Sequence, residues 1–119
     1  MTRLEQLRHV VGILAASPED QQSYLVEIGM VDNSRPVDKL NNIDELGLEF
    51  EDGTYLVAGL LRDHELTAKG AQCIEKLSDF MLQLSGDENR DFWTIQALYE
   101  DRRWTEVRAL AQVCLSEMT

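Results

Sequence analysis

The clearest evidence for the fold class of this 119-residue chain is the stretch TAKGAQCIEKLSDFMLQLSG, residues 67–86. Its apolar residues recur at spacings of three and four, which is the period of one face of an α-helix. They are Ala71, Ile74, Leu77, Met81 and Leu84. Threonine accepts backbone hydrogen bonds at helix starts, and glycine adopts the left-handed turn that ends helices. The stretch therefore predicts an amphipathic helix that begins after Thr67 and closes at Gly86.

The same spacing recurs toward both ends of the chain. It is carried by Leu4, Leu7, Val11 and Leu14 near the start, and by Val107, Leu110, Ala111, Cys114 and Met118 in a last helix expected from about Trp104. Ser17-Pro18-Glu19-Asp20 predicts another helix start, because serine caps, proline suits the first position and acids favour the positive dipole end. Gly29 is expected to end that helix.

The middle of the chain is harder to assign. Residues 30–41 lack periodicity and predict a loop. Residues 43–61 carry apolar residues close to one helical stripe, but three glycines interrupt it at a cost of about 1 kcal/mol each in a helix. The alternative is a hairpin turning at Asp52-Gly53, supported by the alternation of Leu46, Leu48 and Phe50. We favour the helix.

The rest of the chain completes an all-α reading. Asp87 or Asn89 is expected to cap a short helix that carries Phe92, Trp93 and Leu98, and residues 100–103, EDRR, are expected to form a polar connection. We predict a single helical domain over residues 1–119, built as a bundle of five or six helices.

The chain is strongly acidic, with 22 Asp and Glu against 11 Lys and Arg and a formal net charge of −11. Such a charge attracts basic surfaces and repels nucleic acid and anionic membranes, so neither is expected as a partner. The sequence holds no run of about 18 apolar residues. Polar residues interrupt the apolar ones at the N-terminus, which favours an ordinary first helix over a signal peptide and predicts a cytoplasmic protein.

Acidic residues are densest over residues 38–52. The candidate partner-binding residues there are Asp44, Glu45, Glu49, Glu51 and Asp52. On a helix, Glu45, Glu49 and Asp52 share one face. Three interpretations of this stretch remain open: a solvated helix face, a surface for a basic protein partner, or a site for a divalent metal ion. The metal site is disfavoured because no Asp-x-Asp-x-Asp-Gly calcium loop occurs.

No other residues form a recognisable catalytic or cofactor site. His9 and His64 stand apart from any second metal ligand. Cys73 and Cys114 lie in apolar helical patterns and are expected to be buried free thiols. A triad of Cys73, His64 and Asp63 lacks anything that would activate the thiol. We therefore expect no enzyme activity, no cofactor and no metal.

The two tryptophans and one motif leave alternatives open. Trp93 and Trp104 are large aromatic anchors. We favour a role for them in packing the core, and the alternative is a role in an interface. Leu66-Thr67 and Gly70 resemble the start of the last helix in winged-helix DNA-binding proteins. Thr67 as a helix cap explains the same residues, and a basic recognition helix is missing from a chain with only 3 lysines.

Three groups of motifs resemble an uncharacterised family of small acidic helical bacterial proteins. They are Asp44-Glu45-Leu46-Gly47-Leu48-Glu49-Phe50, then Leu84-Ser85-Gly86 with Phe92-Trp93-Thr94 and Ala97-Leu98, then Trp104 with Val107-Arg108 and Leu110-Ala111. They span roughly residues 44–111. The resemblance implies a helical fold and assigns no chemistry. By size and charge alone the chain also looks like an immunity protein that neutralises a bacterial toxin.

These observations favour a non-catalytic acidic binding protein that masks a basic partner, in the manner of an immunity protein bound to a toxin or nuclease. Toxic nucleases are basic because they grip phosphates, and an acidic inhibitor can occupy the same surface. The alternative is a structural or regulatory protein that self-associates into homo-oligomers through its apolar and aromatic faces.

Overall fold

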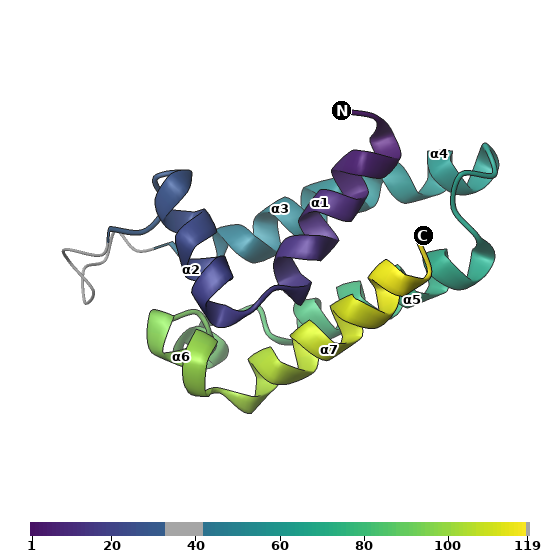
Figure 1. The fold of residues 1–119 in the computed structure, drawn as a ribbon. Helices are drawn as coiled ribbons and strands as arrows, with labels where there is room; N and C mark the ends of the chain where they lie inside the picture. The colour runs from purple at the N-terminus through teal and green to yellow at the C-terminus, as the bar shows by residue number, and fades with distance from the viewer. Residues whose placement is uncertain (33–41, 119) are drawn as a thin grey trace.

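The computed structural model describes residues 1–32 and 42–118, and these fold as α-helices and two short 3-10 helices with no strand among them (Figure 1). The α-helices are α1 (Arg3–Ala15), α2 (Pro18–Glu27), α3 (Glu45–Gly53), α4 (Val57–Arg62), α5 (Ala68–Gln83), α6 (Ile95–Glu100) and α7 (Arg102–Ser116). The 3-10 helices are Thr54–Leu56 and Asp87–Phe92. The predicted all-α class is confirmed.

The helix prediction for residues 43–61 is confirmed, and the hairpin alternative is wrong. This segment nevertheless divides into α3 and α4 at the 3-10 turn Thr54–Leu56, so the described residues hold one α-helix more than the largest predicted number. Most of the loop predicted for residues 30–41 lies outside the described residues. Within the described ranges, no helix is both long enough and apolar enough to cross a membrane.

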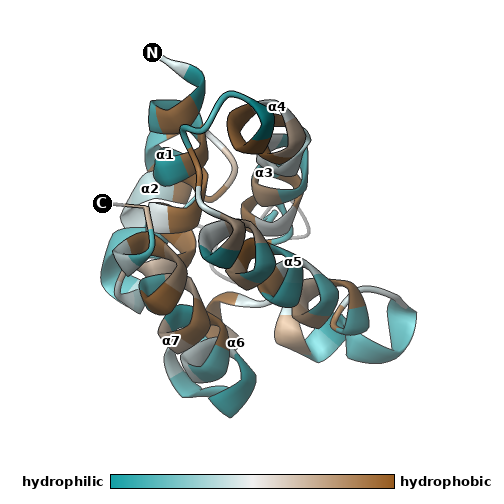
Figure 2. Ribbon diagram, turned by 90° about the vertical axis from the view of Figure 1, so that its right-hand side faces the viewer, coloured by the Kyte–Doolittle hydropathy of each residue, from teal (hydrophilic) through white to brown (hydrophobic). Residues whose placement is uncertain are grey.

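Four helices, α1, α3, α5 and α7, form the main packing contacts of the bundle. α1 and α7 pack against each other, α3 packs on α1, and α5 packs on α7, so that α3 and α5 complete a four-sided arrangement. Figure 2 shows α3 and α5 on the same side of the molecule, across from α1 and α7. α4 approaches the start of α5 and closes one end of this fourth side. The polypeptide thus leaves α3 and the second half of α5 facing each other.

Local capping signals placed most helix ends correctly. The hydroxyls of Ser17 and Thr67 accept hydrogen bonds from the backbone N–H groups of Asp20 (3.2 Å) and Gly70 (3.0 Å). Gly29 and Gly86 have φ values of 80° and 104°, the left-handed region that glycine enters without a steric cost. Thr67 therefore acts as a helix cap, as predicted, and no strand of a wing accompanies it among the described residues.

Two predicted boundaries are wrong. Neither Asp87 nor Asn89 caps the helix that carries Leu98, because residues 87–92 form a 3-10 helix of their own and Thr94 caps α6 instead. The EDRR segment is not a free connection: the Asp101 carboxylate accepts a hydrogen bond from the Arg103 N–H at 2.8 Å and starts α7 at Arg102. A charged cap beside two arginines resembles a polar loop in sequence because both are hydrophilic.

One buried amide connects four helices. Gln21 on α2 is fully buried, and its Nε2 donates to the carbonyl oxygens of Ile13 and Leu14 at the end of α1, both at 3.1 Å. Its Oε1 accepts from the guanidinium of Arg108 on α7 at 2.9 and 3.1 Å. The same guanidinium donates to the carbonyl of Leu98 on α6. Burial lowers the pKa of Arg108, yet no buried side-chain polar atom of the described residues lacks a hydrogen-bond partner.

An aromatic cluster fills the core between α7 and the 3-10 helix Asp87–Phe92. The rings of Phe92 and Trp104 stack at 4.4 Å with an interplanar angle of 7°, and both side chains are fully buried. The indole N–H of Trp104 donates to the Phe92 carbonyl at 2.8 Å. Trp104 is therefore a core residue, which is the role that the sequence favoured for it.

The glycines that weakened the helix prediction allow close packing. A Cβ atom added to Gly53 would lie 2.6 Å from Cγ2 of Val10 on α1, so α1 and α3 cannot approach this closely with a larger residue. A Cβ added to Gly12, within α1, would meet nothing within 4 Å. The propensity cost of Gly53 is therefore offset by the contact that it permits.

This contrast predicts opposite effects for two identical substitutions. Gly12→Ala should raise the free energy of unfolding by about 0.5–1 kcal/mol, since alanine has the higher helix propensity and has room at this position. Gly53→Ala should lower it by about 1–3 kcal/mol, because the added methyl overpacks the contact with Val10. Urea denaturation followed by circular dichroism measures both values. Equal stabilisation by the two substitutions would mean that α1 and α3 are not in this close contact.

Candidate functional site

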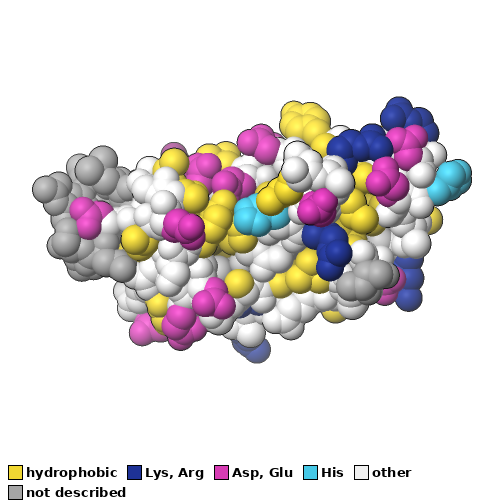
Figure 3. All heavy atoms as spheres, turned by 45° about the horizontal axis from the view of Figure 1, so that its top comes forward, with side chains coloured by type: hydrophobic (Ala, Val, Ile, Leu, Met, Phe, Trp, Pro, Cys, Tyr) yellow, Lys and Arg dark blue, Asp and Glu magenta, His cyan; other side chains and the backbone are white. Residues whose placement is uncertain are grey.

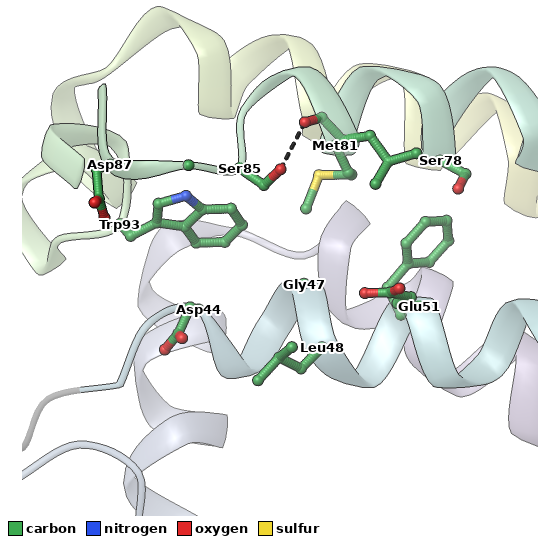
Figure 4. A pocket seen from close by; sticks show the side chains of 12 residues that line it. Asp44, Gly47, Leu48, Glu51, Ser78, Met81, Ser85, Asp87 and Trp93 are labelled. Carbon is green, nitrogen blue, oxygen red and sulfur yellow. Dashed lines mark hydrogen bonds between the residues drawn. The ribbon is translucent and has the colours of Figure 1, made fainter. Parts of the chain in front are cut away.

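A pocket of about 300 Å³ opens between α3 and the second half of α5, on the fourth side of the bundle (Figure 4). Its apolar lining comes from Phe50 on α3, Met81 on α5 and Trp93, which follows the 3-10 helix Asp87–Phe92. Gly47 lets the indole come close, since a Cβ there would lie 2.9 Å from its Cη2 atom. The volume is at the lower end of the range of roughly 300–1,000 Å³ typical of ligand pockets.

Each wall of the pocket is one face of a helix. On α3 and its N-cap the lining residues are Asp44, Gly47, Leu48 and Glu51, and on α5 and its end they are Ser78, Met81, Leu82 and Ser85. Both sets follow the spacing i, i+3, i+4, i+7, so each wall extends for two helical turns. Leu48 and Leu82 are 49% and 60% exposed and form the apolar lips. The pocket is therefore part of a groove between two helices, which we call the α3–α5 groove.

Trp93 is held by one hydrogen bond and two ring contacts at one end of the groove. Its indole N–H donates to the Leu84 carbonyl at 2.9 Å. Its ring meets the rings of Phe92 and Trp104 edge-on, at 4.8 and 5.8 Å. The side chain is half-buried, so part of the indole remains available to a ligand. Trp93 is thus the tryptophan that can serve as an interface anchor, whereas Trp104 is enclosed.

Three carboxylates surround the opening of the groove. They belong to Asp44, Glu51 and Asp87, and we call them the rim carboxylates. Figure 4 shows Asp44 and Asp87 on either side of Trp93 and Glu51 toward the other end. All three residues are exposed, and no Lys or Arg of the described residues forms an ion pair with them. An apolar floor under unneutralised negative charge favours a ligand that is both apolar and cationic.

Four cations of the described residues, Arg3, Arg62, Lys69 and Arg103, form ion pairs away from the groove. Arg3 contacts Asp63 at 2.7 Å and Glu65 at 2.8 Å, and Arg103 contacts Asp101 at 2.7 Å. Hydrogen bonds from these guanidinium groups lower the pKa values of Asp63 and Asp101. On the face shown in Figure 3, most Lys and Arg side chains lie near α4 and the N-terminus with Asp and Glu among them, whereas Asp and Glu predominate over the rest of that face. The charge on this face is therefore unevenly distributed.

The remaining candidate acids lie on another face of α3. Glu45, Glu49 and Asp52 share this face, as their spacing requires, and Glu45 and Glu49 are half-buried. Glu49 accepts a hydrogen bond from the Tyr24 hydroxyl of α2, with its two oxygens 2.8 and 2.7 Å away. Tyr24 in turn meets the ring of His9 edge-on at 5.8 Å. Glu49 therefore has an intramolecular role in joining α2 to α3.

Burial and crowding perturb the ionisation of this face. Desolvation, followed by repulsion from Glu49, Asp44 and Asp52, raises the pKa of Glu45. Burial and the hydrogen bond to the Glu49 carboxylate raise the pKa of Tyr24 to about 12. The neutral phenol is therefore stabilised beside the carboxylate.

The five acids proposed from the sequence thus divide between two surfaces. Asp44 and Glu51 contribute to the rim of the groove, while Glu45, Glu49 and Asp52 lie on another face of α3, where Glu49 bonds to Tyr24 of α2. Their role in partner binding stays a prediction. Asp87 was missed because it lies 36 residues beyond Glu51, and helical spacing relates only residues within one helix. No local signal would have placed it beside α3.

The residues considered for catalysis or metal binding do not gather in the groove. Cys73 on α5 and Cys114 on α7 are free thiols, half-buried and buried respectively. Burial, and the neighbouring Cys73, raise the pKa of Cys114, which disfavours a reactive thiolate. His64 occupies the turn after α4 with φ of 60°. The described residues contain no group of three or more His, Cys, Asp or Glu that could hold a metal ion.

No family model matches the chain, and no curated protein or solved structure is detectably similar to it. The groove must therefore be interpreted from its own chemistry.

The contact between Tyr24 and Glu49 predicts a distinctive alkaline titration. Since its pKa is about 12 in the folded protein against an ordinary value near 10, Tyr24 contributes stability below pH 10 that is lost as the pH rises through 12. Tyrosinate absorbance should show a late phase that disappears in Tyr24→Phe and moves to lower pH in Glu49→Gln. Tyr55→Phe is the control, because Tyr55 is 84% exposed. A late phase that persists in Tyr24→Phe would contradict the assignment.

Proposed function

We propose that this protein is a non-catalytic acidic binding protein that engages a basic protein partner through the α3–α5 groove. The observation that carries the proposal is the combination of an apolar pocket with three rim carboxylates that form no ion pair with a Lys or Arg of the described residues. An acidic surface that only increases solubility does not require an apolar pocket beneath it. The pocket and the rim carboxylates together suit a partner whose basic residues surround an apolar contact.

The most concrete form of this function is an immunity-type inhibitor of a basic toxin or nuclease. A net charge of −11 steers the encounter with a basic surface and can raise the association rate well above that of a neutral pair. The inhibitor then occupies the surface with which the nuclease would grip phosphates. Nucleic acid and anionic membranes, which carry the same sign of charge as this protein, are disfavoured as partners.

The polar groups of the groove support binding rather than catalysis. The Ser85 hydroxyl donates to the Leu82 carbonyl at 2.7 Å and is thereby engaged by the backbone. The described lining residues include no histidine, lysine or cysteine that could act as a base or nucleophile beside the carboxylates. The groove residues are therefore assigned to recognition.

Self-association through the same groove is the second candidate. It is favoured by the exposure of Leu48 and Leu82 at the lips. It is opposed by the repulsion between two copies that each carry a charge of −11. Because salt screens that repulsion, sedimentation velocity from low to high ionic strength distinguishes the two functions. Dimers that strengthen with salt favour self-association, whereas a monomer throughout favours a basic partner.

The partner-binding proposal predicts the effect of neutralising the rim. A photo-crosslinking residue at Leu48 first captures the partner from cells, which should be a basic protein. Association is then measured by stopped flow across ionic strengths for wild type and for D44N/E51Q/D87N. The rim variant should associate roughly tenfold more slowly at low salt and depend less on salt, since exposed charges at an interface mainly set the association rate.

The matched control is E27Q/E75Q/E106Q, which removes the same three charges from exposed positions on α2, α5 and α7 outside the pocket lining. Both variants carry a formal net charge of −8, obtained from −11 by the loss of three carboxylates. The control should slow association much less than the rim variant. Equal slowing would assign the steering to total charge and remove the groove from the proposal, and a neutral or acidic partner would overturn it.

A further inference from the structure

Building on the proposed function, we infer that the α3–α5 groove receives a basic amphipathic α-helix of the partner. That helix presents two cationic side chains about seven residues apart on one face, with apolar side chains between them. The inference names the structural class of the ligand and follows from the shape of the groove, its apolar lining and the positions of its charges.

The shape of the groove fits a helix. Its walls are parallel sets of side chains spaced i, i+3, i+4 and i+7, one from α3 and its N-cap and one from α5 and its end. Seven residues of helix span about 10 Å, which is two turns. The described residues offer no strand edge to which an extended peptide could be added. A third helix laid between these walls would use the helix-in-groove mode of recognition.

The apolar residues that line the groove favour a partner helix that inserts apolar side chains between them. Leu48 and Leu82 face the solvent at its two lips, and Met81 and the exposed part of Trp93 line the space between them. The pocket of about 300 Å³ suits one or two aliphatic side chains better than a whole cofactor. Covering the lips would remove the largest exposed apolar side chains from this side of α3 and α5.

The charges of the rim set the spacing of the two cations. Asp44 and Asp87 flank the Trp93 indole at one end of the groove (Figure 4), and Glu51 lies seven residues after Asp44 at the other. A cation between Asp44 and Asp87 would also lie close to the indole, where a guanidinium gains a cation–π interaction and two-pronged hydrogen bonds. A second cation two turns along the same helix would reach Glu51.

The test uses a synthetic 18-residue helix of alanine and glutamine that carries arginine at peptide positions 5 and 12 and leucine at peptide positions 8 and 9. A shuffled peptide of the same composition places the arginines and leucines on opposite faces. Binding is followed by titration calorimetry and by tryptophan emission, because Trp93 is half-buried in the groove while Trp104 is fully buried. Trp93→Phe identifies the tryptophan that responds.

The patterned helix should bind at least about tenfold more tightly than the shuffled one and should change the emission of Trp93. D44N/E51Q/D87N and the exposed-lip variant L48A/L82A should each weaken it by about tenfold, whereas E27Q/E75Q/E106Q should not. Equal affinity for both peptides would overturn the inference in favour of unspecific charge attraction. So would equally tight binding of arginine amide, or dimers of the free protein that L48A/L82A abolishes.

The outcomes also separate this inference from the proposed function. If the crosslinked partner associates more slowly with the rim variant while the patterned helix does not bind, a basic partner is retained and the helix is rejected. If neither the partner nor the peptide responds to the rim variant, both are rejected. Circular dichroism of every variant confirms that the fold is intact, which is expected because all the altered side chains except that of Trp93 are exposed.

Discussion

The fold depends on a single buried amide. Gln21 is the one polar residue enclosed in the described core, and it joins the end of α1 to α7 by way of the Arg108 guanidinium. Removing Arg108 would leave the buried Oε1 atom of Gln21 without its hydrogen-bond donor, which costs more than the loss of an ordinary surface contact. Because a hydrogen bond is directional, the pair also restricts how α2 and α7 can rotate about their axes. α1 and α7 pack against each other, and α3 and α5 pack on them, so this contact lies at the centre of the helix arrangement.

Contacts between aromatic rings connect the buried core to the groove at the surface. Trp104 stacks on Phe92, and Phe92 meets Trp93 edge-on at the end of the groove. The indole of Trp93 is therefore positioned by α7 although it faces α3. Gly47 completes the arrangement, because a side chain at that position would displace the ring. The same residues that stabilise the fold thus keep an apolar surface open between α3 and α5, which is the kind of rigid support that a recognition site needs.

The acidity of the chain has more than one consequence. On the α2 side of α3, carboxylates are crowded and partly buried, and Glu49 is committed to Tyr24. At the groove, Asp44, Glu51 and Asp87 are exposed and form no ion pair with a cation of the described residues. The structural role of Glu49 and the proposed recognition role of Asp44 and Glu51 therefore fall on two faces of one short helix. A long-range field from −11 charges would favour any basic surface, whereas the groove adds shape and apolar contact, and it is these that can discriminate among basic partners.

The helical class and most helix ends could be predicted from the residues alone, because periodicity, caps and left-handed glycines act within a few residues of each other. The same spacing rule put Glu45, Glu49 and Asp52 on one face of a helix. Four other features depend on the packing of the helices: Glu49 bonds to Tyr24, Asp87 joins Asp44 at the groove, Gln21 is buried, and Gly53 allows a close contact. Each of these depends on which helices meet and at what rotation. Residues far apart in the chain carry no local spacing signal for such contacts, so packing alone settles them.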